Sequence, residues 1–172
     1  NTVEKIMSDI SILKKVNQAS VCIKGKESTN KIGKGLLIYV GINKNDNEES
    51  LDAICEKLLN IKLFHGEGET RWKESVLSLE LEVLIVSNFT LYCNFKGAKP
   101  TFNHSMDGTN AKILFDKLVQ KLKEKYKEEK IKTGEFGEYM FINSDNDGFI
   151  WNEGDSIYGI DIPAWKQIIH ED

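Results

Sequence analysis

Apolar and polar residues alternate along the first half of the chain in patterns typical of β-strands. Residues 10–16 and 19–24 are rich in β-branched and apolar side chains, so they predict two short strands joined by a hinge at 17–18. Residues 36–42 are apolar on both faces of an extended chain, which places this strand at the centre of a sheet covered on both sides. Residues 82–87 predict a second strongly apolar strand.

Two further segments have the spacing of amphipathic helices. The first begins at Asp46, with Glu49 three residues later as in a capping box, and ends near Asn60. The second is capped by Asp107 or Thr109. Its apolar stripe consists of Ala111, Leu114, Phe115, Leu118, Leu122 and Tyr126. Lysines occupy its other face, which we expect to be solvated surface.

The remaining segments predict a turn and several short strands. The turn is at 65–70, and the short strands are expected at 61–64, 131–133, 139–143 and 149–151. Together these elements predict an α/β fold: one domain with a mixed, largely antiparallel sheet packed with two main helices. The domain is expected to span 1–151. Residues 152–172 then form an acidic C-terminal extension that packs on the domain or trails from it.

Length and composition fit a single folded domain. The chain has 172 residues, of which 40% are apolar, enough for a real core and too many for disorder. No apolar run, 36–40 and 83–86 included, approaches the ~20 residues of a membrane helix, and no secretory signal is visible. Cys22, Cys55 and Cys93 are odd in number and irregularly spaced, which argues against a disulfide scaffold or a zinc site. We expect three small buried residues in a cytoplasmic protein.

The net charge of −4 hides an uneven distribution along the chain. Residues 143–172 contain seven acids and one base, so residues 1–142 carry 22 bases against 20 acids. Eight lysines lie between positions 112 and 132. A phosphate-bearing partner is compatible with this charge, but composition alone does not require one.

Candidate chemistry gathers where the apolar strand 82–87 ends. The chain has no Walker loop, nucleophile elbow or zinc-protease motif, and its histidines are scattered. Ser87, Asn88 and Thr90 offer donors and acceptors at a strand end, whereas Phe89 and Leu91 are expected to face the core. Either these polar groups bind a ligand, or they only bond neighbouring backbone groups.

A second polar cluster lies at 145–149. The Asn146-Asp147-Gly148 run predicts a hairpin turn with a positive φ at Gly148. Glycine also permits a ligand to approach the backbone closely. The sequence is compatible with both roles.

Several segments resemble, in order, the motifs of one enzyme family. Residues 87–92, Ser-Asn-Phe-Thr-Leu-Tyr, look like its Ser-Gln-Phe-Thr-Leu-Tyr signature, and 97–102, Gly-Ala-Lys-Pro-Thr-Phe, look like its basic-Pro-Ser-Phe loop. The segments 16–21, 35–41 and 133–140 also match in order. Residues 10–151 therefore resemble the D-aminoacyl-tRNA deacylases.

This resemblance implies a cytosolic homodimer with β/β/α layers and no cofactor. It would hydrolyse the ester between a D-amino acid and the 3′ end of tRNA, and so recycle mischarged tRNA. Catalysis would rest on Ser87, Phe89 and Thr90, with the amides of Phe89 and Thr90 stabilising an oxyanion and positioning water. The alternative mechanism uses Thr90 as nucleophile with His104 as its base.

The resemblance also implies the substrate contacts. The tRNA-contacting residues would be Lys96, Lys99 and some lysines of 112–132. The terminal adenosine and amino acid would lie between the strand end and a Gly-Pro motif of the partner subunit. The implied substrate-binding residues are Asn88, Gly148, Phe149, Met140, Lys99, Pro100, Thr101 and Phe102.

The chain departs from the family pattern in three places, one of which is a pair of residues. Phe149 stands where the family has proline, Trp151 where it has threonine, and Lys14-Lys15 where it has Gln-Arg. A cis bond before a non-proline residue costs ~2.5–4 kcal/mol, so the 148–149 peptide is expected to be trans. Three hypotheses follow: a working deacylase, a catalytically impaired paralogue that binds tRNA or another nucleic acid, and a different hydrolase or structural protein on the same scaffold.

Overall fold

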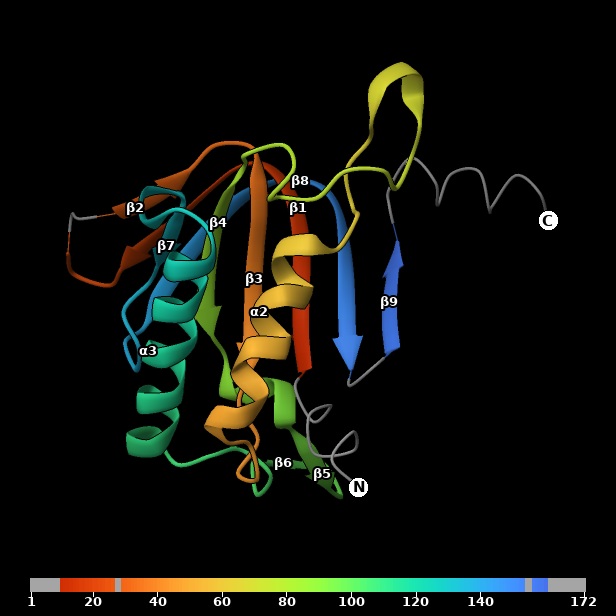
Figure 1. Ribbon diagram of the computed structural model, residues 1–172. Coiled ribbons are helices and arrows are strands. Elements are labelled where there is room, and N and C mark those ends of the chain that lie inside the picture. Colours follow the sequence, from red (N-terminus) through yellow and green to blue (C-terminus); the bar gives the residue numbers. More distant parts are fainter. Residues whose placement is uncertain (1–9, 27–28, 154–155, 161–172) are drawn as a thin grey trace.

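The computed structural model describes residues 10–26, 29–153 and 156–160. Within these ranges a seven-stranded sheet has the order β7-β4-β3-β1-β8-β9, and β2 pairs with β1 off this path (Figure 1). The parallel pairs are β3–β4 and β4–β7, and the others are antiparallel. The strands are β1 (Ile10–Ile23), β2 (Thr29–Ile32), β3 (Gly35–Gly41), β4 (Glu82–Ser87), β7 (Ile131–Thr133), β8 (Met140–Glu153) and β9 (Ser156–Ile160). The predicted mixed, largely antiparallel sheet is confirmed.

Two helices, α2 (Leu51–Asn60) and α3 (Gly108–Lys125), cover one face of this sheet (Figure 1). The apolar stripe of α3 and the buried side of α2 enclose the main core against β3 and β4, with Ile38, Leu58 and Leu122 among its members. Neither helix has the length and apolar run needed to cross a bilayer, and no other helix of the described ranges does. Short 3-10 turns complete the helical elements: η1 (Glu48–Ser50), η2 (Glu67–Glu69), η3 (Phe89–Tyr92) and η4 (Glu128–Lys130).

The opposite face of the sheet is covered by strands. Leu37 of β3 and Leu84 of β4 are fully buried there, in one cluster with residues of β1 and β2. These residues are Val16, Ala19, Val21 and Ile32. The register of β1 against β8 shifts twice between Lys14 and Gln18, and such bulges bend a strand. The second half of β1 therefore bends over the face formed by β3 and β4 and makes, with β2, a second layer of strands. Together with the helices this gives β/β/α layers.

Long-range pairing corrects three predicted strand boundaries. Segments 10–16 and 19–24 form the single strand β1, and 139–143 and 149–151 form the single strand β8. β1 and β8 pair along their whole lengths, so the chain does not divide into two strands at 17–18. Bulges occur where the hinge was expected. The predicted turn at 146–148 is wrong for the same reason, since these residues lie inside β8. Segment 61–64 is not a strand either; only Phe64 forms an isolated bridge, to Glu74.

The helix starts are set by side-chain caps. Asp107 rather than Thr109 caps α3, because its Oδ1 accepts a hydrogen bond from the Asn110 N–H at 3.0 Å. The cap of the first helical segment is Asn47, one residue later than the predicted Asp46, and α2 itself follows from Leu51. The segment starts with the 3-10 turn η1, and Asn47 accepts from the Glu49 N–H at 3.0 Å. Asp46 instead accepts from the Asn43 N–H at 2.8 Å.

Part of the lysine face of α3 forms ion pairs with η1 and α2 on a surface that is still largely exposed to solvent, as expected. The Nζ atoms of Lys117, Lys121 and Lys125 lie 2.8, 3.1 and 3.1 Å from carboxylate oxygens. Their partners are Glu48, Asp52 and Glu56, on the first turn and outer side of the neighbouring helix. These lysines are therefore already neutralised within the fold. The acidic segment 152–172 contributes β9 at the far edge of the sheet, and 161–172 lie outside the described residues.

This ionic contact makes stability depend on pH. Hydrogen bonds from Lys117 and Lys121 lower the pKa of Glu48 and of Asp52 in the folded state. Groups with a lowered pKa stabilise the fold above their unfolded pKa of about 4 and lose that effect as pH falls through the folded pKa. We expect the free energy of unfolding to fall as pH drops below about 4. Urea unfolding of Lys121→Gln over this range is expected to show a shallower fall.

A matched control is Lys123→Gln, because Lys123 lies on the same helix and forms no ion pair within the described residues. Lys123→Gln is expected to keep the pH profile of the natural chain. An unchanged profile for Lys121→Gln would contradict the assigned role of Lys121.

The cysteines are free thiols with different environments. Cys55 is fully buried between the helices, and this burial raises its pKa to about 12. Cys22 and Cys93 are half-buried, so the expectation of three buried residues holds for Cys55 alone. The Cys55 thiol therefore stays protonated and is unreactive.

Candidate functional site

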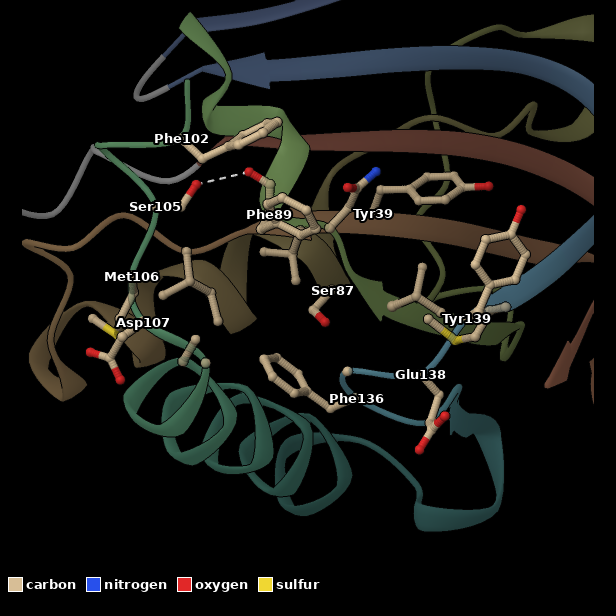
Figure 2. A pocket seen from close by; sticks show the side chains of 18 of the residues that line it. Tyr39, Ser87, Phe89, Phe102, Ser105, Met106, Asp107, Phe136, Glu138 and Tyr139 are labelled. Carbon is tan, nitrogen blue, oxygen red and sulfur yellow. Dashed lines mark hydrogen bonds between the residues drawn. The ribbon is translucent and has the colours of Figure 1, made fainter. Parts of the chain in front are cut away.

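A cavity of about 850 Å³ opens where β4 ends (Figure 2). Its wall combines residues of β3 and β4, the start of η3, the segment before α3 with the first turn of that helix, and the segment 136–142. Apolar and aromatic side chains dominate, and no lysine or arginine of the described ranges lines it. The lining residues used below are Tyr39, Ser87, Asn88, Phe89, Phe102, Ser105, Asp107, Glu138, Tyr139 and Met140.

Asn88 shapes the backbone at the end of β4. Its N–H donates to the Val40 carbonyl at 2.9 Å, which continues the β3–β4 ladder by one bond. Its side-chain Oδ1 accepts from the Thr90 N–H at 3.1 Å and from the Thr90 hydroxyl at 2.5 Å. Asn88 is thus the cap that turns the chain from strand into η3.

Phe89 is held at two points and has a free amide. Its carbonyl accepts from the Ser105 hydroxyl at 2.9 Å, and its ring packs edge-to-face on Phe102 with centroids 4.9 Å apart (Figure 2). Its N–H is the first of η3 and makes no hydrogen bond to another described residue. The side chain is 59% exposed, so the expectation that it faces the core is wrong. A 3-10 turn, not a continued strand, rotates this residue outward.

A further part of the wall comes from β3, the strand paired with β4, and from the segment that leads into β8. Tyr39, Glu138, Tyr139 and Met140 line it (Figure 2). Burial raises the pKa of Tyr39, so its hydroxyl remains a neutral donor near pH 7. Sequence reasoning identified only Met140 here. The other three stand in segments with no polar motif, so no local pattern marks them.

Two carboxylates give the cavity an acidic border. Hydrogen bonds from the backbone and side chain of Asn110 lower the pKa of Asp107, so it stays ionised. Glu138 is exposed and has no ion-pair partner among the described residues. The cavity therefore suits apolar groups and a cation such as an ammonium, and phosphate groups would lie outside it.

The structure brings some of the predicted site residues together and leaves others apart. Ser87, Asn88, Phe89, Phe102 and Met140 line the cavity. A second group lies on exposed or half-exposed positions beside it: Thr90, Lys96, Lys99, Pro100 and Thr101. Gly148 and Phe149 contribute backbone to β8, and their side chains lie outside the described residues.

Thr90 has a different role from the one expected. Its hydroxyl and N–H both donate to Asn88, so the amide is not a free oxyanion donor. His104 is exposed, and its backbone carbonyl accepts from the Lys44 N–H at 2.9 Å. The alternative mechanism, with Thr90 activated by His104, is therefore not supported by this geometry.

The departures on β1 and β8 lie beside each other. Lys14 and Phe149 are paired positions in the β1–β8 register. The Lys14 ammonium lies 5.6 Å from the centre of the Tyr39 ring, which borders the cavity. Lys15 is only 3% exposed, and its ammonium lies 5.5 Å from the Trp72 ring. The sequence changes are thus coupled through one strand pair next to the site.

Comparison with known proteins gives consistent matches. The family model described as D-Tyr-tRNA(Tyr) deacylase matches residues 12–151. D-aminoacyl-tRNA deacylase 1 of Danio rerio is 39% identical over 80% of the chain, and D-aminoacyl-tRNA deacylase of Thermosipho melanesiensis is 37% identical over 80%. These matches cover 66% of the first relative and 91% of the second, so the chain spans just under two thirds of the first relatives' length.

A solved structure supports the same fold. The structure titled "c-Myc DNA Unwinding Element Binding Protein" superposes with a TM-score of 0.80 and 33% sequence identity. The superposition covers 86% of the chain and 99% of that structure. The layered α/β architecture is therefore shared over nearly the whole described region.

Proposed function

The chain belongs to the D-Tyr-tRNA(Tyr) deacylase family, and from this membership and the cavity at the end of β4 we propose that it hydrolyses the ester of D-aminoacyl-tRNA. The observation that carries the proposal is Phe89, which lines an apolar cavity with an acidic border and whose N–H donates to no other described residue. Apolar walls suit an amino-acid side chain, and the carboxylates of Asp107 and Glu138 suit its ammonium group. The alternative of a non-hydrolysing paralogue is not favoured, because the curated relatives are named deacylases.

In the proposed mechanism the protein supplies placement rather than a nucleophile. An aminoacyl ester is already activated, so a positioned water and a stabilised oxyanion are sufficient. The Phe89 N–H is the donor for the oxyanion, and Ser87 is the hydroxyl beside it. Thr90 acts through Asn88, since its two hydrogen bonds fix the turn that presents this amide. Met140 adds a contact from β8 of the same subunit, and the segment at Gly148 and Phe149 is proposed to reach the substrate from the partner subunit.

The proposal includes a cytoplasmic homodimer. Tyr139 and Phe141 are 66% and 50% exposed, and their rings stack edge-to-face with centroids 5.3 Å apart. An exposed aromatic pair next to the cavity supports a second subunit at this position. Free thiols at Cys22, Cys55 and Cys93 support a reducing compartment. Sedimentation of Tyr139→Ser against Lys123→Gln tests the dimer.

The test of the activity compares three esters: D-Tyr-tRNA, L-Tyr-tRNA and Gly-tRNA. We expect rapid loss of the D-ester above a no-enzyme control, and survival of the L-ester. Loss of both chiral esters would show that the replacement of the family proline by Phe149 has relaxed chiral selection. The variant Lys123→Gln, at a half-buried position that does not line the cavity, is expected to match the natural chain.

Survival of all three esters at high enzyme concentration would contradict the proposed activity. Two hypotheses would then remain: a nucleic-acid-binding paralogue, and a different hydrolase or structural protein on the same scaffold. Binding of uncharged tRNA, measured in parallel, separates the first of these from a protein with no RNA contact.

A further inference from the structure

A small hairpin projects beside the cavity. Strands β5 (Asn94–Lys96) and β6 (Lys99–Thr101) pair antiparallel at the lower end of the view in Figure 1, and Gly97 allows the tight turn between them with a φ of +64°. The hairpin is anchored at both ends to the cavity wall. It follows η3, which begins at Phe89, and it leads directly into Phe102.

The hairpin carries the most exposed large apolar side chain of the described residues. Phe95 is 71% exposed and stands directly opposite Pro100 in the pairing. Paired positions share one face of a two-stranded ribbon, so Phe95 and Pro100 form a flat apolar platform. Nothing in the described part of the chain covers this platform, and a soluble fold has no internal use for it.

Positive charge surrounds this platform. Lys96 and Lys99 are paired with each other at the tip of the hairpin, and neither has an ion-pair partner among the described residues. No acid occurs between positions 88 and 106. The lysines of α3, in contrast, are largely neutralised by α2, and the cavity itself has an acidic border. Lys14 and Lys24 also lie near the cavity, but their ammonium groups sit over the rings of Tyr39 and Tyr139. The two lysines of the hairpin instead flank the exposed platform.

An exposed aromatic ring between free lysines is the arrangement that binds single-stranded nucleic acid. Bases stack on aromatic faces, and the ammonium groups contact the phosphates. We infer that the β5–β6 hairpin binds the single-stranded 3′ end of the RNA substrate, with a base stacked on Phe95 and phosphates on Lys96 and Lys99. This inference rests on the proposed function and adds the element that guides the acceptor end to the cavity.

A second copy of the chain is a less suitable occupant. A two-fold interface centred on the hairpin would bring Lys96 and Lys99 close to the same lysines of the other copy, with no acid between 88 and 106 to compensate. A single-stranded nucleic acid matches both features, because its phosphates contact the lysines and its bases stack on the aromatic ring.

The test uses an uncharged synthetic RNA hairpin with a short single-stranded 3′ overhang, and the same duplex with a blunt end. Phe95→Ala is expected to weaken binding of the overhang RNA about 10-fold, with no effect on the blunt duplex and no change in the slope of log K against log salt. Lys96→Gln and Lys99→Gln are each expected to reduce that slope by about 0.7. Ile113→Ala, a 49% exposed apolar residue on α3, is the matched control and is expected to bind like the natural chain.

A substitution that keeps the stacking face gives a direct signature. Phe95→Trp is expected to retain affinity, and its fluorescence is expected to be quenched by the overhang RNA beyond the quenching seen in the natural chain. Equal affinity of Phe95→Ala and the natural chain for the overhang RNA would overturn the inference. So would a change in sedimentation of Phe95→Ala with RNA binding intact, because it would assign the platform to self-association.

Failure of this inference is distinguishable from failure of the proposed function. Binding is measured on uncharged RNA, and ester hydrolysis is measured separately. Phe95-dependent binding without hydrolysis would support the hairpin contact and contradict the activity. Hydrolysis with binding that is independent of Phe95 would do the reverse.

Discussion

Replacement of Phe89 by proline is expected to lower kcat for ester hydrolysis about 10²–10³-fold relative to Phe89→Ala, which is the effect of losing one oxyanion donor. Proline lacks the N–H that the mechanism assigns to the oxyanion, whereas alanine keeps it and removes only the ring. The position tolerates proline, because Phe89 is the first residue of η3 and Asn88 before it is extended, with φ −146° and ψ 102°. Single-turnover rates on D-Tyr-tRNA measure the difference.

Comparison of these two variants separates the kinetic effect of the Phe89 ring from that of the Phe89 amide. Phe89→Ala loses the contact with Phe102, so it is expected to affect KM more than kcat. Circular dichroism and urea unfolding check that Phe89→Pro folds like Phe89→Ala. Equal kcat values for two folded variants would refute the role of the Phe89 amide.

Gly35→Ala is expected to have the second large effect, a lower free energy of unfolding. Gly35 and Glu82 are paired positions at the start of β3 and β4, and a Cβ on Gly35 would overlap the Glu82 carbonyl oxygen and lie 2.7 Å from its carbonyl carbon. Backbone atoms in a central strand pair cannot move aside, so overpacking is expected to lower the free energy of unfolding by about 3 kcal/mol or more. Urea unfolding measures this change.

Gly108→Ala is the matched control. A Cβ at Gly108, the first residue of α3, meets no atom within 4 Å, and alanine favours the helix. We expect its midpoint in urea to equal or exceed that of the natural chain. A Gly35→Ala variant with the same midpoint as Gly108→Ala would show that β3 and β4 are able to separate at this point.

Local patterns predicted the elements whose signal is contained in a short window. The apolar segments 36–42 and 82–87 are β3 and β4 to within a residue, and Asp107 caps α3 as one of the two predicted alternatives. Segments whose secondary structure depends on pairing with a strand far away in the sequence were predicted less well. The Asn-Asp-Gly run of 146–148 has the local preference of a turn, yet it lies inside β8 because β1 pairs along the whole strand.

The same distinction between local patterns and long-range contacts applies to the candidate site. The sequence by itself determined that Ser87, Asn88 and Phe89 stand at the end of a buried strand, because strand period and motif are both local. Only the tertiary structure decided that Tyr39 and Glu138 line the same cavity as these residues, and that Asn88 engages Thr90 and leaves the Phe89 amide free. It also decided that α2 neutralises the lysines of α3 while those of the hairpin remain free of ion pairs within the described residues. The physical reason is that cavities and ion pairs depend on distances between segments far apart in the chain, and periodicity within one segment carries no information about those distances.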